Sequence, residues 1–167
     1  AILLAGLAVP GETIIVEPAP SRDHSERMLR HFGAEVRVSD DASEGRTVTL
    51  SGQPELMARA MSVPGDISSA AFPLAAALIV PGSDVLLKTV GINPLRSGLL
   101  DCVRDMGATV ELRDAREVSG EPVADIAVRA SKLHGIDVPA TRAPSMIDEY
   151  PILAVLAACA DGPSRLS

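Results

Sequence analysis

Two neighbouring carboxylates, Asp148 and Glu149, stand immediately before an apolar run that begins at Pro151. Proline is favourable at the first position of a helix, so a helix is predicted to start there. The residue before a proline is biased toward extended geometry, which predicts that Tyr150 is extended and that the two acidic residues lie on a connection at the helix entrance. A carboxylate in such a place can exchange protons with a substrate, or it can solvate the turn and complement the helix dipole. From the residues alone, the second interpretation is the simpler one for both.

Arg22 is the other residue whose type suits chemistry. It lies in Ser21-Arg-Asp-His24, where an amphipathic helix is predicted to open. Arginine makes charge-assisted, often bidentate hydrogen bonds to phosphate and carboxylate groups. From the residues alone, an ion pair with Asp23 or Glu26 is the simpler explanation for Arg22, and Ser21 is expected to cap the helix.

The histidines and cysteines indicate neither a metal site nor a nucleophile. His24, His31 and His134 do not form a zinc-ligand pattern. Cys102 and Cys159 fall in apolar helical patterns, which predicts two buried thiols. Reduced cysteines fit a cytosolic protein.

The composition limits the class of protein. Of the 167 residues, 47% are hydrophobic and only 2% are aromatic, which predicts a substantial but aliphatic core. The 15 basic and 22 acidic residues give a net charge of −7, which argues against a nucleic-acid-binding surface. The longest apolar runs, 70–80 and 152–160, reach about half of the ~20 residues that a membrane-spanning helix needs. The chain opens on an apolar run without Met, and we expect it to be an internal piece of a longer protein.

An internal repeat organises the chain. A helix-like apolar run, a Pro-Gly pair and a β-branched stretch follow one another over residues 1–16 and again over 70–87. The glycines of the two pairs, Gly11 and Gly82, are 71 residues apart. Residues 151–161 begin a third copy. The alternation of helix and strand predicts an α/β fold.

Each of the first two copies continues with a second amphipathic helix. These helices are predicted to end at Gly33 and Gly107, because glycine suits a left-handed C-cap. A strand, a polar turn and another strand should follow, with the turns at 40–46 and 114–122. With one more strand before its first helix, each unit reads βαβαββ.

A boundary between units is predicted within residues 61–66, where a Pro-Gly pair interrupts regular structure. Asp66 is expected to cap the helix that follows. The helix-start amides near Ser68 and Ser69 could instead hold an anion. Pro73 lies within the first turns of this helix, which predicts a late start or a kink.

Four segments, in order along the chain, resemble the 5-enolpyruvylshikimate-3-phosphate synthase family. They are Ala1-Ile-Leu-Leu-Ala-Gly-Leu7, Glu17-Pro-Ala-Pro-Ser-Arg-Asp-His-Ser-Glu-Arg-Met-Leu29 with Phe32-Gly-Ala34, Val63-Pro-Gly-Asp-Ile-Ser-Ser-Ala-Ala-Phe72, and Arg142-Ala-Pro-Ser-Met-Ile-Asp-Glu-Tyr-Pro-Ile-Leu-Ala-Val155. The second and fourth segments are specific, and the fourth is similar to the bacterial subgroup that includes glyphosate-insensitive enzymes. The resemblance implies the inside-out α/β barrel of enolpyruvyl transferases, built from βαβαββ units and incomplete here. It implies no metal and no cofactor.

The resemblance also implies roles for single residues. The family uses the aspartate matched by Asp148 to hold the acceptor's hydroxyl groups and to take part in proton transfer, and the arginine matched by Arg22 to contact shikimate 3-phosphate. Asp148 is therefore the predicted catalytic residue, and both residues are predicted to bind substrate, whereas Glu149 is expected only to solvate the turn. Residues 1–62 are expected to be the last repeat unit of one domain, and residues 63–167 the first one and a half units of the other. The chain alone is therefore predicted to be inactive.

The function implied by the resemblance is transfer of the enolpyruvyl group of phosphoenolpyruvate to the 5-hydroxyl of shikimate 3-phosphate, with release of phosphate, in aromatic amino acid biosynthesis. The partners expected are these two small molecules, with no nucleic acid and no membrane, in a monomeric cytoplasmic enzyme. Three alternatives remain open. The parent could act on UDP-N-acetylglucosamine, since that enolpyruvyl transferase shares the fold. The units could form a non-catalytic binding domain, or the chain could be a truncated product that aggregates through exposed apolar faces.

Overall fold

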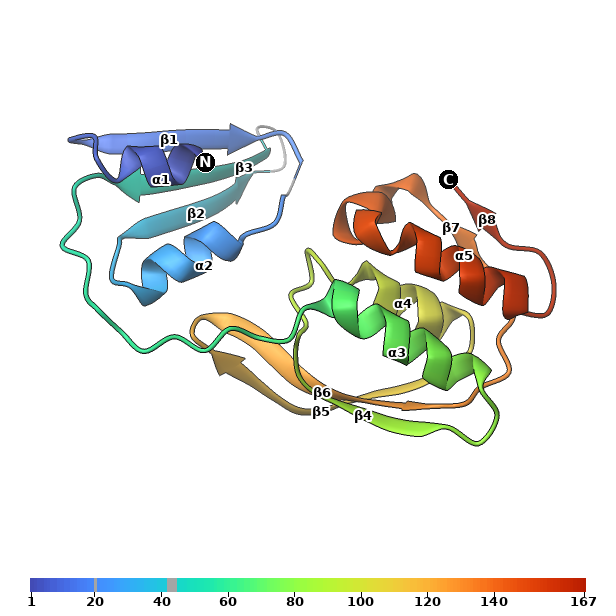
Figure 1. Ribbon diagram of the computed structural model, residues 1–167. Coiled ribbons are helices and arrows are strands. Elements are labelled where there is room, and N and C mark those ends of the chain that lie inside the picture. The colour runs from blue at the N-terminus through green and yellow to red at the C-terminus, as the bar shows by residue number, and fades with distance from the viewer. Residues whose placement is uncertain (20, 42–44) are drawn as a thin grey trace. The chain divides into compact units, whose positions relative to one another are not determined.

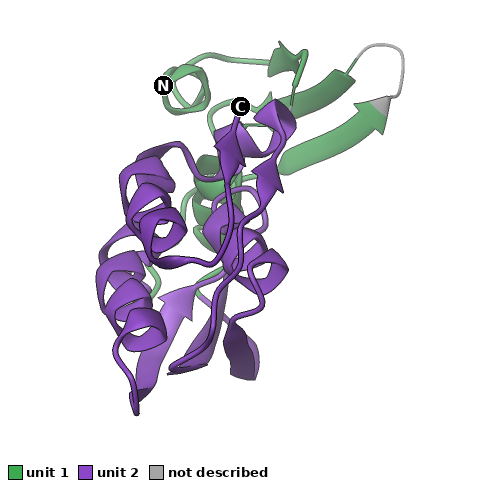
Figure 2. Ribbon diagram, turned by 90° about the vertical axis from the view of Figure 1, so that its right-hand side faces the viewer, with its two compact units in different colours: residues 1–62, 119–121 green, residues 63–118, 122–167 purple. Residues whose placement is uncertain are grey.

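The computed structural model describes residues 1–19, 21–41 and 45–167. The described chain forms two compact units, which Figure 2 distinguishes by colour. The first contains residues 1–62 and 119–121, and the second contains residues 63–118 and 122–167. Each unit is described by itself below.

The first unit consists of two helices and a three-stranded sheet (Figure 1). Its elements are α1 (Ile2–Gly6), β1 (Glu12–Glu17), α2 (His24–His31), β2 (Val36–Asp41) and β3 (Gly45–Ser51). The strand order is β1-β3-β2, and β3 is antiparallel to both neighbours. The buried apolar side chains form a small aliphatic core of Leu3, Leu29, Ala34, Val36, Val48 and Leu50.

The second unit begins with the same succession of elements and continues further. Its elements are α3 (Ile67–Ile79), β4 (Asp84–Gly91), α4 (Gly98–Asp105), β5 (Thr109–Val118), β6 (Glu121–Arg129), β7 (Asp137–Val138), the short 3₁₀ helices η1 (Ala140–Ser145) and η2 (Ile147–Glu149), α5 (Tyr150–Cys159) and β8 (Arg165–Leu166). The main sheet has the order β4-β6-β5. The largest fully buried apolar side chains are Leu74, Leu78, Leu99, Leu100, Met106, Ile126, Met146, Leu153 and Leu156. The aliphatic core predicted from composition is thus confirmed.

The predicted repeat is confirmed down to the ends of its helices. In both units the third strand of the repeat lies between the other two. Gly33 and Gly107 follow α2 and α4 with φ of +95° and +86°, a region that favours glycine. The amide of Ala34 donates to the carbonyl of Leu29 at 2.9 Å, and that of Ala108 donates to Val103 at the same distance. Both helices therefore end in the same Schellman geometry.

The strand expected before each first helix is much reduced in the described chain. Ahead of α3 it consists of an isolated parallel bridge between Gly65 and Val90 of β4. Ahead of α5, β7 is a two-residue strand parallel to β8. A parallel strand on either side of a helix is the βαβ arrangement that the repeat predicts.

Three expectations about local structure are corrected. The polar segment 114–122 was predicted to be a turn, yet β5 runs to Val118 and the chain reverses only at Ser119 and Gly120, which have φ of +52° and +85°. The other polar turn, 40–46, is shorter than predicted, since β2 reaches Asp41 and β3 begins at Gly45; residues 42–44 lie outside the described chain, as does Pro20. The helix expected to start late or kink at Pro73 instead begins at Ile67 and continues through the proline.

The two thiols have different environments. Cys102 is buried in α4, as predicted, but Cys159, the last residue of α5, is exposed, so the prediction of two buried thiols is wrong for Cys159. In the described residues, no helix combines the length and apolar character needed to cross a membrane.

Candidate active site

Asp148 lies in the single 3₁₀ turn η2, directly before α5. Tyr150 is helical, with φ −54° and ψ −41°, so the extended geometry predicted for it is wrong, and α5 starts one residue before Pro151. The acidic pair is therefore part of a continuous helical entrance rather than of an extended connection. The Asp148 side chain is 51% exposed, and its Oδ2 lies 3.7 Å from Nη1 of Arg96. An accessible carboxylate beside a cation is an arrangement that can bind a hydroxyl group and exchange its proton.

Glu149 does not solvate the turn as predicted, because it is buried with only 2% of its surface exposed. Its Oε1 accepts a hydrogen bond from the hydroxyl of Ser68 in the first turn of α3. Its Oε2 is buried and has no hydrogen-bond partner among the described residues. Within η2, the side chain of Asp148 is thus exposed and that of Glu149 is buried.

The segment that carries Asp148 is held against α4. Met146 is fully buried, and its sulfur lies 3.4 Å from Sγ of Cys102. Arg142 donates to Oδ2 of Asp105 at 2.7 Å and contacts the same thiol at 3.4 Å. Burial raises the pKa of Cys102, although the neighbouring Arg142 acts in the opposite direction. The protonated, buried thiol is suited to packing and not to nucleophilic attack.

A close backbone approach completes this attachment. A Cβ added to Gly98, the first residue of α4, would lie 2.3 Å from Oγ of Ser145 and 3.2 Å from the side chain of Met146. Glycine at this position therefore lets η1 pack directly on the start of α4. Asp148 follows Met146 by only two residues. The contact between Gly98 and this segment therefore determines where η2 lies.

Asp66 caps α3, as predicted from the sequence. Its Oδ2 accepts hydrogen bonds from the amide and the hydroxyl of Ser69, both at 3.0 Å. Its Oδ1 accepts a hydrogen bond from Nη2 of Arg96 at 2.9 Å. Burial acts to raise the pKa of Asp66, but the hydrogen bonds from Arg96 and Ser69 outweigh it and lower the pKa to about 2. The carboxylate is therefore a permanent anion at neutral pH.

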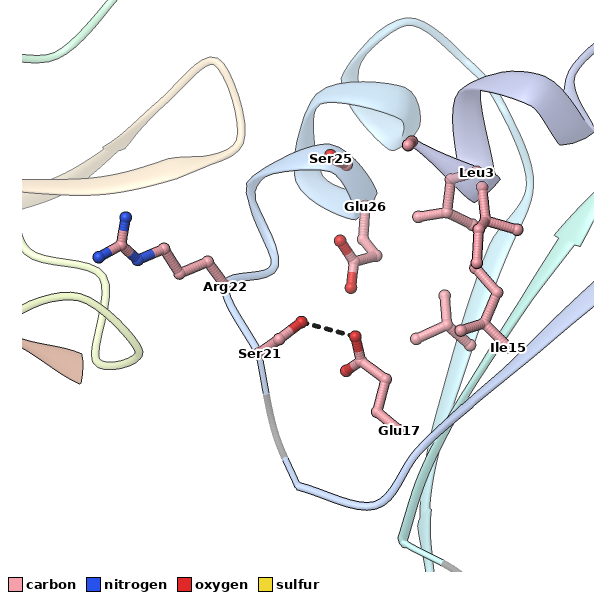
Figure 3. Close-up of a pocket in the computed structure, with 10 residues that line it drawn as sticks. Leu3, Ile15, Glu17, Ser21, Arg22, Ser25 and Glu26 are labelled. Carbon is pink, nitrogen blue, oxygen red and sulfur yellow. Dashed lines mark hydrogen bonds between the residues drawn. The ribbon is translucent and has the colours of Figure 1, made fainter. Parts of the chain in front are cut away.

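Arg22 lies in the loop between β1 and α2, two residues before the helix begins. The N-cap is Asp23, whose side chain makes no capping hydrogen bond, so the expectations that Arg22 opens the helix and that Ser21 caps it are wrong. The hydroxyl of Ser21 instead donates to Oε1 of Glu17 at the end of β1, at 2.6 Å. Figure 3 shows the guanidinium of Arg22 pointing away from Glu17 and Glu26. A cavity of about 300 Å³ lies beside this loop and is lined by Ala1, Ile2, Leu3, Ile15, Glu17, Ser21, Arg22, Ser25, Glu26 and Val48.

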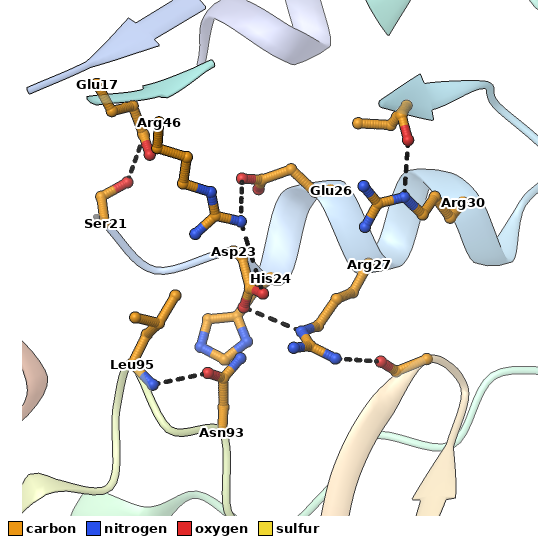
Figure 4. A network of polar contacts seen from close by, with 12 residues as sticks. Glu17, Ser21, Asp23, His24, Glu26, Arg27, Arg30, Arg46, Asn93 and Leu95 are labelled. Atoms are coloured by element: carbon orange, nitrogen blue, oxygen red, sulfur yellow. Dashed lines mark hydrogen bonds and ion pairs between the residues drawn. The ribbon is translucent and has the colours of Figure 1, made fainter. Parts of the chain in front are cut away.

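Buried charges hold the Arg22 loop in place (Figure 4). Arg46, on β3, lies 3.8 Å from Asp23 and 3.7 Å from Glu26, and the side chains of all three are at most 10% exposed. Arg27 pairs with Asp23 at 3.0 Å across one turn of α2. This network fixes the start of α2 to the sheet.

The two predicted site residues belong to different compact units, Arg22 to the first and Asp148 to the second. The described residues contain no cluster of His, Cys, Asp and Glu side chains that could hold a metal ion. Arg96 was not among the residues predicted from the sequence, although the repeat carried a signal for it. Arg22 precedes Gly33 by eleven residues, and Arg96 precedes Gly107 by eleven, so the two arginines occupy the same position of the repeat.

Comparisons with known proteins agree on one family. The model of the EPSP synthase (3-phosphoshikimate 1-carboxyvinyltransferase) family matches residues 1–167. A 3-phosphoshikimate 1-carboxyvinyltransferase from Rhodospirillum rubrum is 61% identical over 166 residues, and one from Methylorubrum populi is 62% identical over 169 residues; the matches cover 99% and 100% of this chain. The chain spans 37% of the length of each of these curated relatives.

Solved structures give the same result for the fold. EPSP synthase from Acinetobacter baumannii superposes with a TM-score of 0.91 at 46% identity, over 99% of this chain and 37% of that one. The enolpyruvyl transferase NikO from Streptomyces tendae superposes with a TM-score of 0.71 at 20% identity, over 97% of this chain and 36% of that one, and so shows likeness of fold alone. The α/β fold of enolpyruvyl transferases, incomplete here, is thereby confirmed.

Proposed function

This chain belongs to the EPSP synthase family, and from that premise we propose that the protein containing it transfers the enolpyruvyl group of phosphoenolpyruvate to the 5-hydroxyl of shikimate 3-phosphate. The observation that carries the proposal at the level of residues is Asp148, a half-exposed carboxylate in the family's motif that lies beside Arg96. The relatives named as 3-phosphoshikimate 1-carboxyvinyltransferases, at 61% and 62% identity, support the choice of substrates.

The reaction has a simple balance. The acceptor's hydroxyl loses a proton as its oxygen bonds to C2 of phosphoenolpyruvate, and C3 gains a proton, which gives a tetrahedral intermediate. Cleavage of the C2–O bond to phosphate, with loss of a proton from C3, then restores the double bond. Each step needs a group that accepts or donates a proton, together with cations that bind two anionic substrates.

We assign Asp148 to the acceptor's hydroxyl groups, as the acid–base group that exchanges the proton of the reacting oxygen. Arg22 is assigned to binding shikimate 3-phosphate, because a guanidinium recognises phosphate and carboxylate oxygens through two parallel hydrogen bonds. Under this proposal the two compact units belong to different domains of the intact enzyme, one ending near residue 62 and the other beginning near residue 63. We also propose that the enzyme is a monomer of the cytoplasm.

The test is phosphate release by the intact enzyme, measured with phosphoenolpyruvate and shikimate 3-phosphate as acceptor. Asp148→Asn should lower kcat by about 10² or more, as expected for loss of a positioned acid–base group. Asp101→Asn is the matched control, since Asp101 is an exposed aspartate of the same unit that pairs with Arg104, and it should retain full activity. Phosphate release only with UDP-N-acetylglucosamine would overturn the acceptor, and full activity of Asp148→Asn would overturn its role.

Arg22 needs a separate measurement because its role is binding. Arg22→Gln should raise KM for shikimate 3-phosphate by about 10-fold or more with a smaller change in kcat, since it removes a charge-assisted contact to the substrate. Arg59→Gln, which changes an exposed arginine of the same unit, should leave KM unchanged. An unaltered KM in Arg22→Gln would contradict the assignment.

A further inference from the structure

Arg96 connects its own turn, between β4 and α4, to two other segments of the second unit. Its Nη2 donates to Oδ1 of Asp66 at 2.9 Å and to Oγ of Ser68 at 3.0 Å, both at the start of α3. Its Nη1 lies 3.7 Å from Oδ2 of Asp148 on η2. The planar fork of a guanidinium presents donors in several fixed directions at once, which the ammonium group of lysine cannot do. Arg96 therefore fixes the distance between the start of α3 and Asp148.

The backbone prepares Arg96 for this position. Asn93 is 3% exposed, and its side-chain oxygen accepts a hydrogen bond from the amide of Leu95 at 2.9 Å. The carbonyl of Asn93 accepts a hydrogen bond from the amide of Arg96 at 2.8 Å. Two hydrogen bonds accepted by the buried Asn93 thus close the turn between β4 and α4, so the Arg96 side chain projects from a fixed backbone. The Arg96 side chain is only 21% exposed, so most of it is held by packing.

The contacts of Arg96 reach Asp148 by two routes. One is the direct approach of the guanidinium to the carboxylate. The other passes through Ser68, which accepts from Arg96 and donates to the buried Glu149, the residue next to Asp148. Asp66 supplies a permanent negative charge at Nη2 of the same guanidinium. The cation is thereby held in place by groups other than Asp148, whose side chain is 51% exposed and which is followed directly by the buried Glu149.

We propose that Arg96 is a positioning residue for Asp148, which orients the carboxylate toward the acceptor's hydroxyl groups. The inference rests on the function proposed above for Asp148. It is supported independently by the repeat, because Arg96 occupies in the second unit the position that Arg22 occupies in the first. The same loop of the repeat thus provides one arginine that is assigned to the substrate and one that holds a catalytic side chain.

A double-mutant cycle in the intact enzyme tests the proposal. Arg96→Gln should lower kcat/KM for shikimate 3-phosphate by about 10- to 100-fold, and Arg96→Lys should restore only part of that loss. In the Asp148→Asn background, Arg96→Gln should cause little further loss, because the group that it positions is already changed. Arg104→Gln, which removes an exposed arginine of α4, should retain full activity in both backgrounds.

The outcomes separate this inference from the function on which it rests. Equal losses from Arg96→Gln in the two backgrounds would mean a purely structural role and would overturn the inference. So would full activity of Arg96→Gln alongside an inactive Asp148→Asn. If Asp148→Asn itself is fully active, the proposed role of Asp148 fails first. Should Arg96→Gln not fold, the comparison of Arg96→Lys with the parent, in both backgrounds, gives the same test.

Discussion

The two units share one order of elements, but they hold their site residues by different means. In the first unit, the loop of Arg22 is fixed by the buried charges of Asp23, Glu26 and Arg46, over a core of six apolar side chains. In the second unit, Asp148 rests on a much larger aliphatic core through Met146, and its carboxylate lies beside the guanidinium of Arg96. A repeat can therefore keep its topology while the forces that stabilise each copy diverge. The first copy should be sensitive to loss of charge, and the second to loss of volume.

The largest effect is expected from the cores, at a pair of equivalent leucines. Leu74 of α3 and Leu3 of α1 are 71 residues apart, the spacing of the Pro-Gly pairs. Leu74 is fully buried in a 13-residue helix, whereas Leu3 is 7% exposed in a helix of five residues. Leu74→Ala should cost about 3–5 kcal/mol and Leu3→Ala about 2 kcal/mol, because Leu74 is completely buried in the larger core whereas Leu3 lies at the edge of the smaller one. Denaturant unfolding of the intact protein measures both, and equal costs would contradict the difference between the cores.

Loss of a buried charge should rank second and should affect the first unit. Arg46→Met leaves Asp23 and Glu26 buried without their shared cation, and we expect a cost of about 3 kcal/mol. Arg37→Met removes an arginine that is 58% exposed in its ion pairs on the same sheet and should cost less than ~0.5 kcal/mol. Thermal unfolding of the two variants gives the comparison. A similar cost for both would show that burial of the network contributes nothing.

Gly98 offers a sharper comparison, since His24 is its counterpart in the first unit. In Gly98→Ala, the added methyl group would overlap Ser145 and Met146. This overpacking should lower the free energy of unfolding by about 1–3 kcal/mol. It should also displace η2 and reduce kcat. His24→Ala removes a partly exposed hydrogen bond with Glu121, a residue of the same compact unit, and should cost about 1 kcal/mol or less. If Gly98→Ala is as stable and active as the parent, the close packing of η1 on α4 does not position Asp148.

The smallest effect concerns Asp66, whose pKa of about 2 is below its usual value of 3.8. A lowered pKa means that the ionised form stabilises the folded state, so this contribution is complete well above pH 3.8 and is lost as the pH falls toward 2. Because the side chain is 47% exposed, Asp66→Asn should cost only about 0.5–1 kcal/mol near neutral pH. The difference in stability between the parent and Asp66→Asn should shrink from pH 5 to pH 3. A difference that grows with acid would contradict the assignment.

Local patterns predicted the parts of the fold that local forces decide. The amphipathic spacing and the glycines at 33 and 107 predicted α2 and α4 together with their ends, and Asp66 predicted its cap. β5 was missed in part because it is an edge strand, where exposed side chains such as those of Arg113 and Asp114 give a strand the composition of a turn.

The candidate site depended much less on local pattern. Asp148 and Arg22 were predicted through the family's motifs, since their residue types alone favoured surface roles. The burial of Glu149 and the approach of Arg96 to Asp148 depend on packing between segments that are 52 or more residues apart in the chain, which no local spacing encodes. Only the register of the repeat pointed to Arg96.

Because one thiol is exposed and the other is buried, alkylation can report local opening of the second unit. Only a thiolate reacts with an alkylating reagent, and Cys159 is exposed, whereas Cys102 is inaccessible and its pKa is raised by burial. One label per molecule therefore marks the closed second unit, and a second label marks a molecule in which α4 has separated from Met146 and Arg142. The rate at which doubly alkylated molecules accumulate, followed by mass spectrometry, would measure how often the segment bearing Asp148 detaches. The two native cysteines suffice, so no substitution is needed.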